Sequence, residues 1–169
     1  MNLWFRLILT LLRARFGYAL GALDRSVVPF RVWPTDLDVN AHMNNGRYAT
    51  LMDLGRVDLM ARAGLLSIIR RERMYPVVTA QHILYRRSLD PFQLFTLETR
   101  ILGVDERFAY LEQRFLRGET VHARGVVQAL FLRPGEGRVP TDEMMALFGV
   151  QDAPQVPVET LAMFPAPDA

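Results

Sequence analysis

A long apolar segment between residues 44 and 70 constrains the fold of this chain more than any other feature. Its hydrophobic residues recur at helical spacing and form a broad stripe. The stripe consists of Tyr48, Leu51, Met52, Leu59 and Leu66, widened by Leu54, Val57, Ala61 and Leu65. Favourable acid–base pairs at i,i+3 and i,i+4 spacing support a helix there. A helix with so wide an apolar stripe must be covered on several sides by other elements.

Strand-like segments flank this helix in the sequence. One precedes it at residues 27–33, where Pro29 indicates an edge strand or a bulge. Four follow it, at residues 76–88, 94–103, 108–117 and 120–133. The second and the fourth of these segments show alternation most clearly. Phe95, Leu97 and Thr99 share one side of the second, and His122, Arg124 and Gln128 are expected to face solvent on the fourth. This order predicts an α+β fold in which an antiparallel sheet curls around one helix.

The length of 169 residues fits a single domain, which we place at residues 23–150. An amphipathic helical segment, residues 1–22, precedes it. A proline-rich tail, residues 151–169, follows and is expected to be extended or mobile. Before that tail we expect a short helix at residues 141–148, capped by Thr141.

Composition excludes several kinds of chemistry. All twenty basic residues are arginine, so no lysine is present to form a Schiff base. The chain has no cysteine and only three widely separated histidines, which excludes thiol catalysis and gives no metal-ligand spacing. Net charge is +2, and the arginines are not interleaved with aromatic residues on one element, so nucleic-acid binding is not expected.

The N-terminal residues 2–16 (NLWFRLILTLLRARF) form an apolar stretch interrupted by three arginines. Its uncharged run, residues 7–12, is far too short to span a bilayer, and no small-residue cleavage site follows it. Two roles stay open: a helix that packs on the domain or on a partner subunit, and a basic amphipathic helix that contacts a membrane surface through residues 1–16. We therefore expect a cytoplasmic protein, and the alternative is a protein attached peripherally to a membrane.

Residues 34–48 (PTDLDVNAHMNNGRY) gather the polar chemistry of the chain. Asn44 or Asn45 can cap the free N–H groups at the start of the long helix. A capped helix start presents N–H donors and the positive end of the macrodipole, which suits a developing oxyanion. Asp36 and Asp38 lie close to that start and could supply a nucleophile or general base. For each of them a structural turn or cap is the alternative role.

The order of elements and the pattern D-x-D-x-x-x-H-x-N-N-x-x-Y resemble the hotdog-fold thioesterases. The residues that form this pattern are Asp36, Asp38, His42, Asn44, Asn45 and Tyr48. The 4-hydroxybenzoyl-CoA thioesterase-like group is the branch it resembles most. The thioesterase superfamily member 6 type, with a hydrophobic N-terminal segment and an HMNN motif, is also similar. The resemblance covers residues 27–133 and implies hydrolysis of a fatty or aromatic acyl-CoA to free acid and CoA.

The resemblance also implies roles for individual residues. Asp38 matches the carboxylate that attacks the thioester or activates water. The backbone N–H of Asn45 would polarise the thioester carbonyl, and His42 would organise the loop and contact substrate. The residues expected to bind substrate are Asn44, Tyr48, Arg86 and Arg87, the two arginines through the phosphates of coenzyme A. Asp53 and Arg56 are expected to support the helix.

Hotdog domains assemble as dimers or dimers of dimers, so the resemblance implies an active site at a subunit interface. No cofactor is expected, because coenzyme A is part of the substrate.

Two competing functions stay open. A hotdog hydratase or dehydratase typically carries a proline beside its histidine, whereas this chain has Ala41 and Met43 beside His42. The other competitor is a catalytically silent acyl-CoA-binding or membrane-peripheral scaffold protein. The presence of Asp38 disfavours it, since a silent site has no need of the carboxylate.

Overall fold

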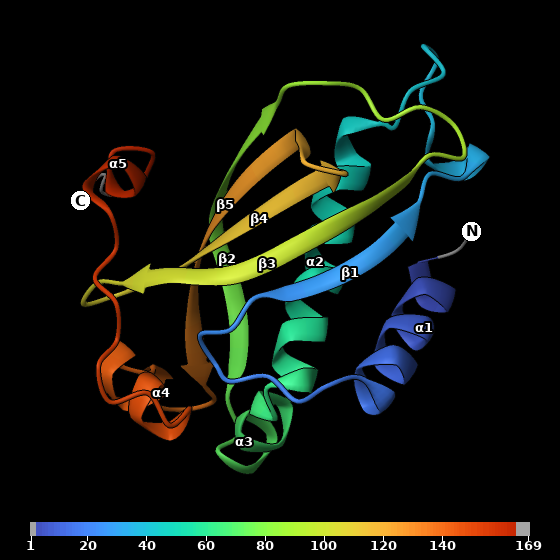
Figure 1. Cartoon of the computed structure of the whole chain (residues 1–169). Helices are drawn as coiled ribbons and strands as arrows, with labels where there is room; N and C mark the ends of the chain where they lie inside the picture. Colours follow the sequence, from blue (N-terminus) through green and yellow to red (C-terminus); the bar gives the residue numbers. More distant parts are fainter. Residues whose placement is uncertain (1–2, 165–169) are drawn as a thin grey trace.

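A computed structural model of the chain describes residues 3–164 (Figure 1). The helices are α1 (Leu3–Phe16), the 3-10 helix η1 (Pro34–Asp36), α2 (Asn45–Arg62), α3 (Leu65–Arg71), α4 (Thr141–Leu147) and α5 (Val158–Leu161). The strands are β1 (Ser26–Arg31), β2 (Tyr75–Tyr85), β3 (Leu94–Val104), β4 (Ala109–Arg117), β5 (Thr120–Arg133) and β6 (Gly137–Arg138).

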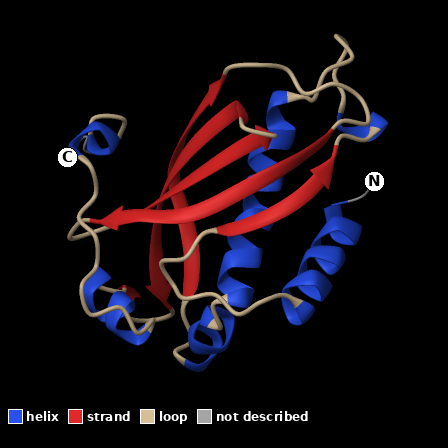
Figure 2. Ribbon diagram, viewed as in Figure 1, coloured by secondary structure: helices blue, strands red, loops and turns tan. Residues whose placement is uncertain are grey.

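One curved antiparallel sheet runs in the order β1-β3-β4-β5-β2, with β6 paired to β5 (Figure 2). The long helix α2 lies within the curve, and α1 packs beside α2 next to β1. This arrangement confirms the predicted hotdog fold. Pro29 lies in β1, at one edge of the sheet, where a residue without an N–H is tolerated.

The broad stripe of α2 forms the core. Leu51, Met52 and Leu59 are almost completely buried, as the sequence pattern predicts. The helix approaches the sheet closely at Gly55, where a Cβ atom would lie only 2.6 Å from Thr99 Oγ1. Glycine at this position therefore allows α2 to sit deep in the sheet.

The prediction of one helix from Asn44 to about Arg70 is wrong, because the structure has two helices there. Helix α2 ends at Arg62, and Gly64, with φ of 71°, starts the separate helix α3. The left-handed backbone at Gly64 turns the chain at little steric cost.

Two smaller predictions need correction. Pro140, not Thr141, occupies the N-cap position of α4, and no side chain caps that helix start. The Thr141 hydroxyl instead donates to the Asp105 carbonyl. His122 does not face solvent: it is 7% exposed, and its Nδ1 lies 2.9 Å from the Ser88 carbonyl oxygen. The short β2–β3 connection covers this outer face of β5, which strand alternation cannot reveal.

The tail is not simply extended either. Gln155 forms a parallel bridge with Val104, Val156 is buried, and α5 follows. A Cβ atom on Gly103 would collide with the backbone of residues 154–156, so that glycine permits the packing. Residues 1 and 2 of the expected N-terminal segment and residues 165–169 of the tail lie outside the described residues. No helix within residues 3–164 has the length and hydropathy needed to span a bilayer.

Candidate active site at the start of helix α2

The loop between β1 and α2 is held by Asp36 at its base. Asp36 is 1% exposed, and its Oδ2 accepts a 2.9 Å hydrogen bond from the backbone N–H of Trp33 and pairs with the buried guanidinium of Arg6. Its carbonyl accepts from the N–H of Asn44 at 2.8 Å. Asp36 is therefore the cap and anchor of the loop, the structural role that the sequence left open.

Asp38 organises the tip of the same loop. Its Oδ1 accepts hydrogen bonds from the backbone N–H groups of Asn40 at 2.9 Å and His42 at 3.4 Å. Its own N–H donates to the His42 carbonyl at 2.9 Å, and Ala41 adopts a left-handed φ of 58° between them. Within residues 3–164, Asp38 Oδ2 accepts no hydrogen bond. One carboxylate oxygen thus stabilises the turn, and the other remains available for chemistry.

Helix α2 begins at Asn45, with Asn44 as its N-cap. The Asn44 side chain accepts a 2.8 Å hydrogen bond from the N–H of Gly46, which settles which of the two asparagines caps the helix. In the described part of the chain, the N–H of Asn45 donates to no protein group. This donor lies at the positive end of an 18-residue helix and is free to bind an oxyanion.

An aromatic cluster packs between the first turns of α2 and the sheet. The ring of Tyr48 packs edge-on against Tyr85, 5.0 Å between centroids, and against Phe115 at 4.8 Å. The Tyr85 hydroxyl donates to the Asn45 carbonyl at 3.3 Å, which ties the end of β2 to the start of α2. Burial raises the pKa of Tyr48 to about 12, so its phenol is neutral at physiological pH. At 2% exposure, Tyr48 faces the core of this subunit rather than open solvent.

His42 lies at the rim of the loop. Its Nε2 is 3.6 Å from Asp90 Oδ1, and both side chains are about half exposed. The backbone N–H of Met43 donates to the Leu89 carbonyl at 2.9 Å, so the loop between β2 and β3 braces the candidate site. Sequence reasoning missed Asp90, Leu89 and the Tyr85 hydroxyl, because they lie about forty residues from the motif and carry no spacing signal of their own.

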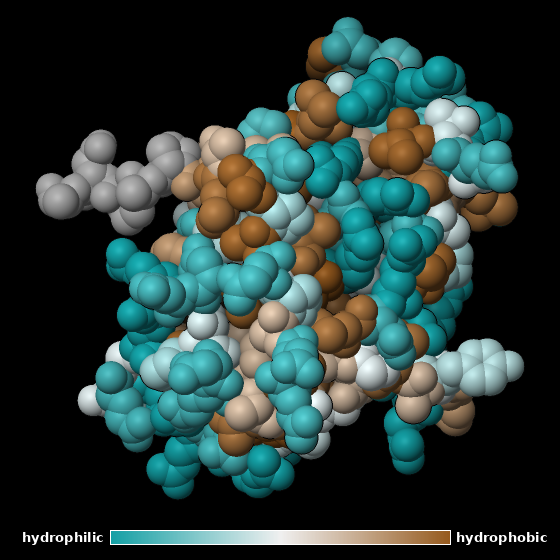
Figure 3. Space-filling model, turned by 60° about the vertical axis from the view of Figure 1, so that its left-hand side comes forward, coloured by the Kyte–Doolittle hydropathy of each residue, from teal (hydrophilic) through white to brown (hydrophobic). Residues whose placement is uncertain are grey.

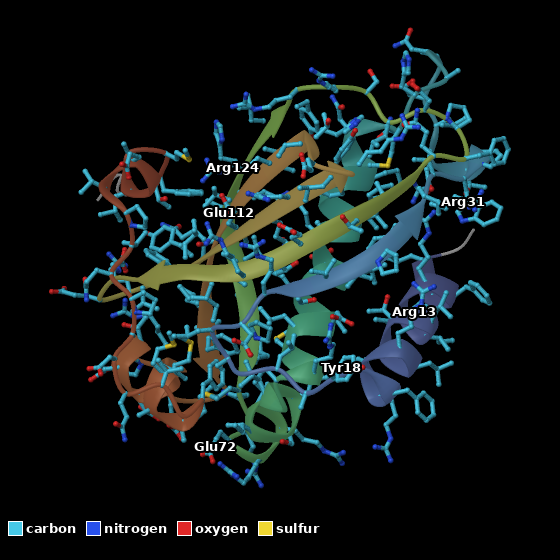
Figure 4. All side chains as sticks on the ribbon, viewed as in Figure 1. Arg13, Tyr18, Arg31, Glu72, Glu112 and Arg124 are labelled. Carbon is cyan, nitrogen blue, oxygen red and sulfur yellow. The ribbon has the colours of Figure 1, made fainter. Side chains whose placement is uncertain are left out.

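Arg86 and Arg87 lie at the end of β2 beside a basic groove. Their backbone N–H groups both donate to the His122 carbonyl, and their side chains are exposed. The groove, about 610 Å³ in volume, is also lined by Arg114 and Arg124 from β4 and β5. Figure 4 shows Arg124 next to Glu112, the one acidic side chain that lines the groove. Arg124 pairs with Glu112 and Arg114 pairs with Glu98, which leaves the exposed Arg86 and Arg87 to give the groove its excess positive charge.

An apolar cavity of about 210 Å³ lies between the second half of α2, the sheet and α4. Asp53 and Arg56 line its wall. Arg56 donates to Gln113 Oε1 at 2.7 Å and pairs with Asp53, while Gln113 Nε2 donates to the Met52 carbonyl at 2.8 Å. Burial lowers the pKa of Arg56, but the neighbouring Asp53 opposes that shift. This network fixes Arg56 in place, in keeping with the supporting role expected for it.

Comparisons with known proteins agree with this geometry. The family model of the Thioesterase-like superfamily matches residues 32–162. Protein THEM6 from Danio rerio is 44% identical over 94 residues, which cover 56% of this chain and 46% of that protein. Protein THEM6 from Drosophila melanogaster is 30% identical over 118 residues, covering 69% of this chain and 61% of that protein. The chain thus spans about half the length of these relatives.

Solved structures share the fold. A probable thioesterase from Bartonella henselae matches with a TM-score of 0.62 and 22% identity, over 69% of this chain and 98% of that one. YbaW, a probable thioesterase from Escherichia coli, matches with a TM-score of 0.68 and 19% identity, over 72% and 94% of the two chains. The family model covers well over half of the sequence and includes both the loop and α2. The chain therefore belongs to the Thioesterase-like superfamily.

Proposed function

We propose that the protein hydrolyses an acyl-CoA thioester to the free acid and CoA. The observation that carries this proposal is that one hydrogen-bonded segment holds both groups: the Asp38 carboxylate, with one oxygen that accepts no hydrogen bond within residues 3–164, and the N–H of Asn45 at the start of α2. The thioester carbonyl oxygen would accept from that N–H, which stabilises the negative charge that develops on it. Family membership supports the same reaction class.

Asp38 supplies the second half of the chemistry. Its Oδ2 either removes a proton from water as the water adds to the carbonyl carbon, or attacks that carbon directly to form an acyl-aspartyl anhydride that water then cleaves. In both routes the C–S bond breaks, the CoA thiolate leaves and takes up a proton, and the acid is released. His42, with Asp90 beside it, would contact the substrate.

The apolar cavity supports a fatty or aromatic acyl group as substrate. Of its lining residues only Asp53 and Arg56 are charged. It lies at least about 12 Å along α2 from Asn45, since Asp53 is eight residues further on and each residue rises about 1.5 Å. In a dimer, the same cavity of the second subunit would lie closer to the reacting carbonyl than the cavity of the subunit's own chain.

We propose a homodimer in which β2 pairs with β2 of a second copy. This strand ends the sheet and leaves apolar side chains exposed, among them Tyr75, Val78 and Leu84. Two-fold symmetry requires the strands to pair antiparallel. The Tyr85 end, which contacts Asn45, would then lie beside the Tyr75 end of the other copy, where Pro76 and Val78 line the cavity. Each oxyanion site would thereby face an acyl cavity of its partner, and two such dimers could associate further.

The basic groove supports binding of the coenzyme A phosphates. Arg86 and Arg87 would contact the phosphates together with Arg114 and Arg124. One guanidinium group can donate two parallel hydrogen bonds to two oxygens of a phosphate. A pool of acyl-CoA is required for this function, so we propose the cytoplasm as its compartment.

One observation favours a second candidate function. Asp38 Oδ1 accepts two backbone hydrogen bonds and therefore has a structural role whether or not the site is active. A protein that binds acyl-CoA without hydrolysing it would keep this aspartate for the turn.

The two functions are separated by thiol release from a panel of acyl-CoAs that includes aliphatic chains of increasing length and aromatic acyl groups. The protein has no cysteine, so a thiol-reactive dye reports only the CoA released. Turnover of at least one substrate supports the hydrolase. Binding of acyl-CoA by calorimetry with no thiol release would instead support the silent binder.

A further inference from the structure

Helix α1 directs three of its polar side chains, Arg6, Thr10 and Arg13, toward the protein, whereas Arg15 is exposed. Arg6 and Thr10 are 4% and 2% exposed, and Arg6 pairs with Asp36. One turn further on, Arg13 donates to the Pro29 carbonyl of β1 at 3.0 Å (Figure 4). These residues recur at three- and four-residue spacing and therefore form the inner face of the helix.

The outer face of α1 is apolar and exposed. Its large hydrophobic side chains are Leu3, Trp4, Phe5, Ile8, Leu11, Leu12 and Phe16, between 39% and 85% exposed. A groove of about 350 Å³ separates α1 from β1. Polar side chains, among them Arg13 and Arg31, line it together with the exposed apolar side chains of Trp33 and Leu94. In contrast, the face over α4 and α5 mixes polar and apolar side chains (Figure 3). A continuous apolar patch of this kind marks a surface that contacts another apolar phase.

The charges around the patch indicate that its partner is a negatively charged surface. Residues 1–23 contain no aspartate or glutamate, and the exposed Arg13 and Arg15 lie in the last turn of α1. Aromatic and aliphatic residues beside arginines suit the interface of an anionic lipid bilayer. The β2 edge proposed for dimerisation lies at the opposite end of the sheet from β1, so that dimer leaves α1 uncovered.

We propose that the outer face of α1 lies flat on the surface of an anionic phospholipid bilayer. Ile8 and Leu12 enter the boundary between headgroups and acyl chains, while Arg15 contacts lipid phosphates. The buried pair of Arg6 with Asp36 joins this helix to the base of the candidate active-site loop. Membrane contact therefore holds the loop at a fixed position relative to the bilayer. This proposal does not depend on the reaction that the site performs.

The test uses the full chain and vesicles of phosphatidylcholine alone or mixed with phosphatidylglycerol. Co-sedimentation is expected with the anionic vesicles, and binding should fall at about 1 M salt, where the Debye length is only about 3 Å. In Trp33→Phe, Trp4 is the single remaining tryptophan, and its emission should shift to the blue when these vesicles are added. Absence of co-sedimentation and of a blue shift with either vesicle would overturn the proposal.

A matched pair of variants tests the surface itself. Ile8→Ser with Leu12→Ser removes two half-exposed apolar side chains from α1. Val158→Ser with Leu161→Ser removes two exposed apolar side chains, 80% and 39% exposed, from α5. The α1 variant should bind anionic vesicles about tenfold more weakly or worse, and the α5 variant should bind like the wild type. Unchanged melting temperatures would show that both variants are folded.

Wild-type binding by the α1 variant would contradict the proposal. A second pair of results would also contradict it: the wild type does not bind vesicles, and light scattering shows a smaller oligomer for the α1 variant than for the wild type. The patch would then contact a second copy of the chain.

Discussion

Asp36 and Asp38 are two residues apart and have different environments. Asp36 is buried and pairs with a guanidinium from the N-terminal helix, whereas Asp38 lies at the loop tip with one oxygen in a turn. The sequence could indicate that both are good turn residues. It could not show that Asp36 anchors the loop. The partner of Asp36, Arg6, lies thirty residues earlier in the chain, and the sequence does not indicate with which carboxylate that arginine pairs.

At the residue scale, the Asn44 cap gives a direct prediction. Asn44→Ala should lower the free energy of unfolding by about 1 kcal/mol, because the N–H of Gly46 loses its acceptor. Turnover should fall as well, since the neighbouring Asn45 N–H is then less firmly oriented. Urea unfolding and kcat measure the two effects. Asn44→Ser keeps a side-chain acceptor and serves as the control; equal losses in both variants would argue against the cap as the cause.

At the element scale, the link between α1 and the loop depends on a buried ion pair. Arg6→Met should cost about 3–5 kcal/mol, because Asp36 would remain buried without its principal partner. Asp36→Asn alone should also be costly. The double variant should lose clearly less than the sum of the two, since both charges are then absent. Additive losses in a double-mutant cycle would mean that the two residues do not stabilise each other.

The outer face of the sheet carries a second ion cluster with a predictable pH dependence. Burial alone would raise the pKa of Glu112, but hydrogen bonds from Arg124 and Arg100, at 2.6 and 2.8 Å, lower it overall. A carboxyl whose pKa is lower in the folded state stabilises the fold above its unfolded pKa, which is about 4.3. That contribution is lost as the pH falls through the folded pKa.

The wild type should therefore be more stable than Glu112→Gln at pH 7, by about 1–2 kcal/mol because the arginines are partly solvated. The difference should shrink as the pH falls below about 4. Urea unfolding of both proteins across this range makes the measurement. A difference that stays constant with pH would show that the carboxylate charge is not what stabilises the cluster.

The elements were largely predictable because their signals are local. The alternation of Phe95, Leu97 and Thr99 and the stripe along α2 gave the sheet and the helix that it encloses. The break at Gly64 and the burial of His122 were not predictable, because each depends on where the following segment packs. The outward apolar face of α1 was equally hidden: periodicity shows that a helix has two faces, but not which one meets the protein.

At the scale of the whole molecule, the two edges of the sheet should behave differently. Val78 on β2 and Val27 on β1 are 41% and 43% exposed, and each lies on an edge strand. Val78→Lys should convert the proposed dimer to a monomer, because a charge on an edge strand opposes pairing with another strand. Val27→Lys should leave it dimeric. Light scattering on both variants decides, and a monomeric wild type would contradict the β2 interface.

The most direct test of the central claim compares two substitutions of Asp38. Asp38→Asn keeps an oxygen that can accept from Asn40 and His42 but removes the charge, whereas Asp38→Ala removes both. If Asp38 performs the chemistry, both variants should release thiol from acyl-CoA at least about a hundredfold more slowly than the wild type, a loss of about 2.7 kcal/mol in transition-state stabilisation. Near-normal turnover by Asp38→Asn with loss in Asp38→Ala would show that the residue only shapes the turn, and would contradict the proposed mechanism.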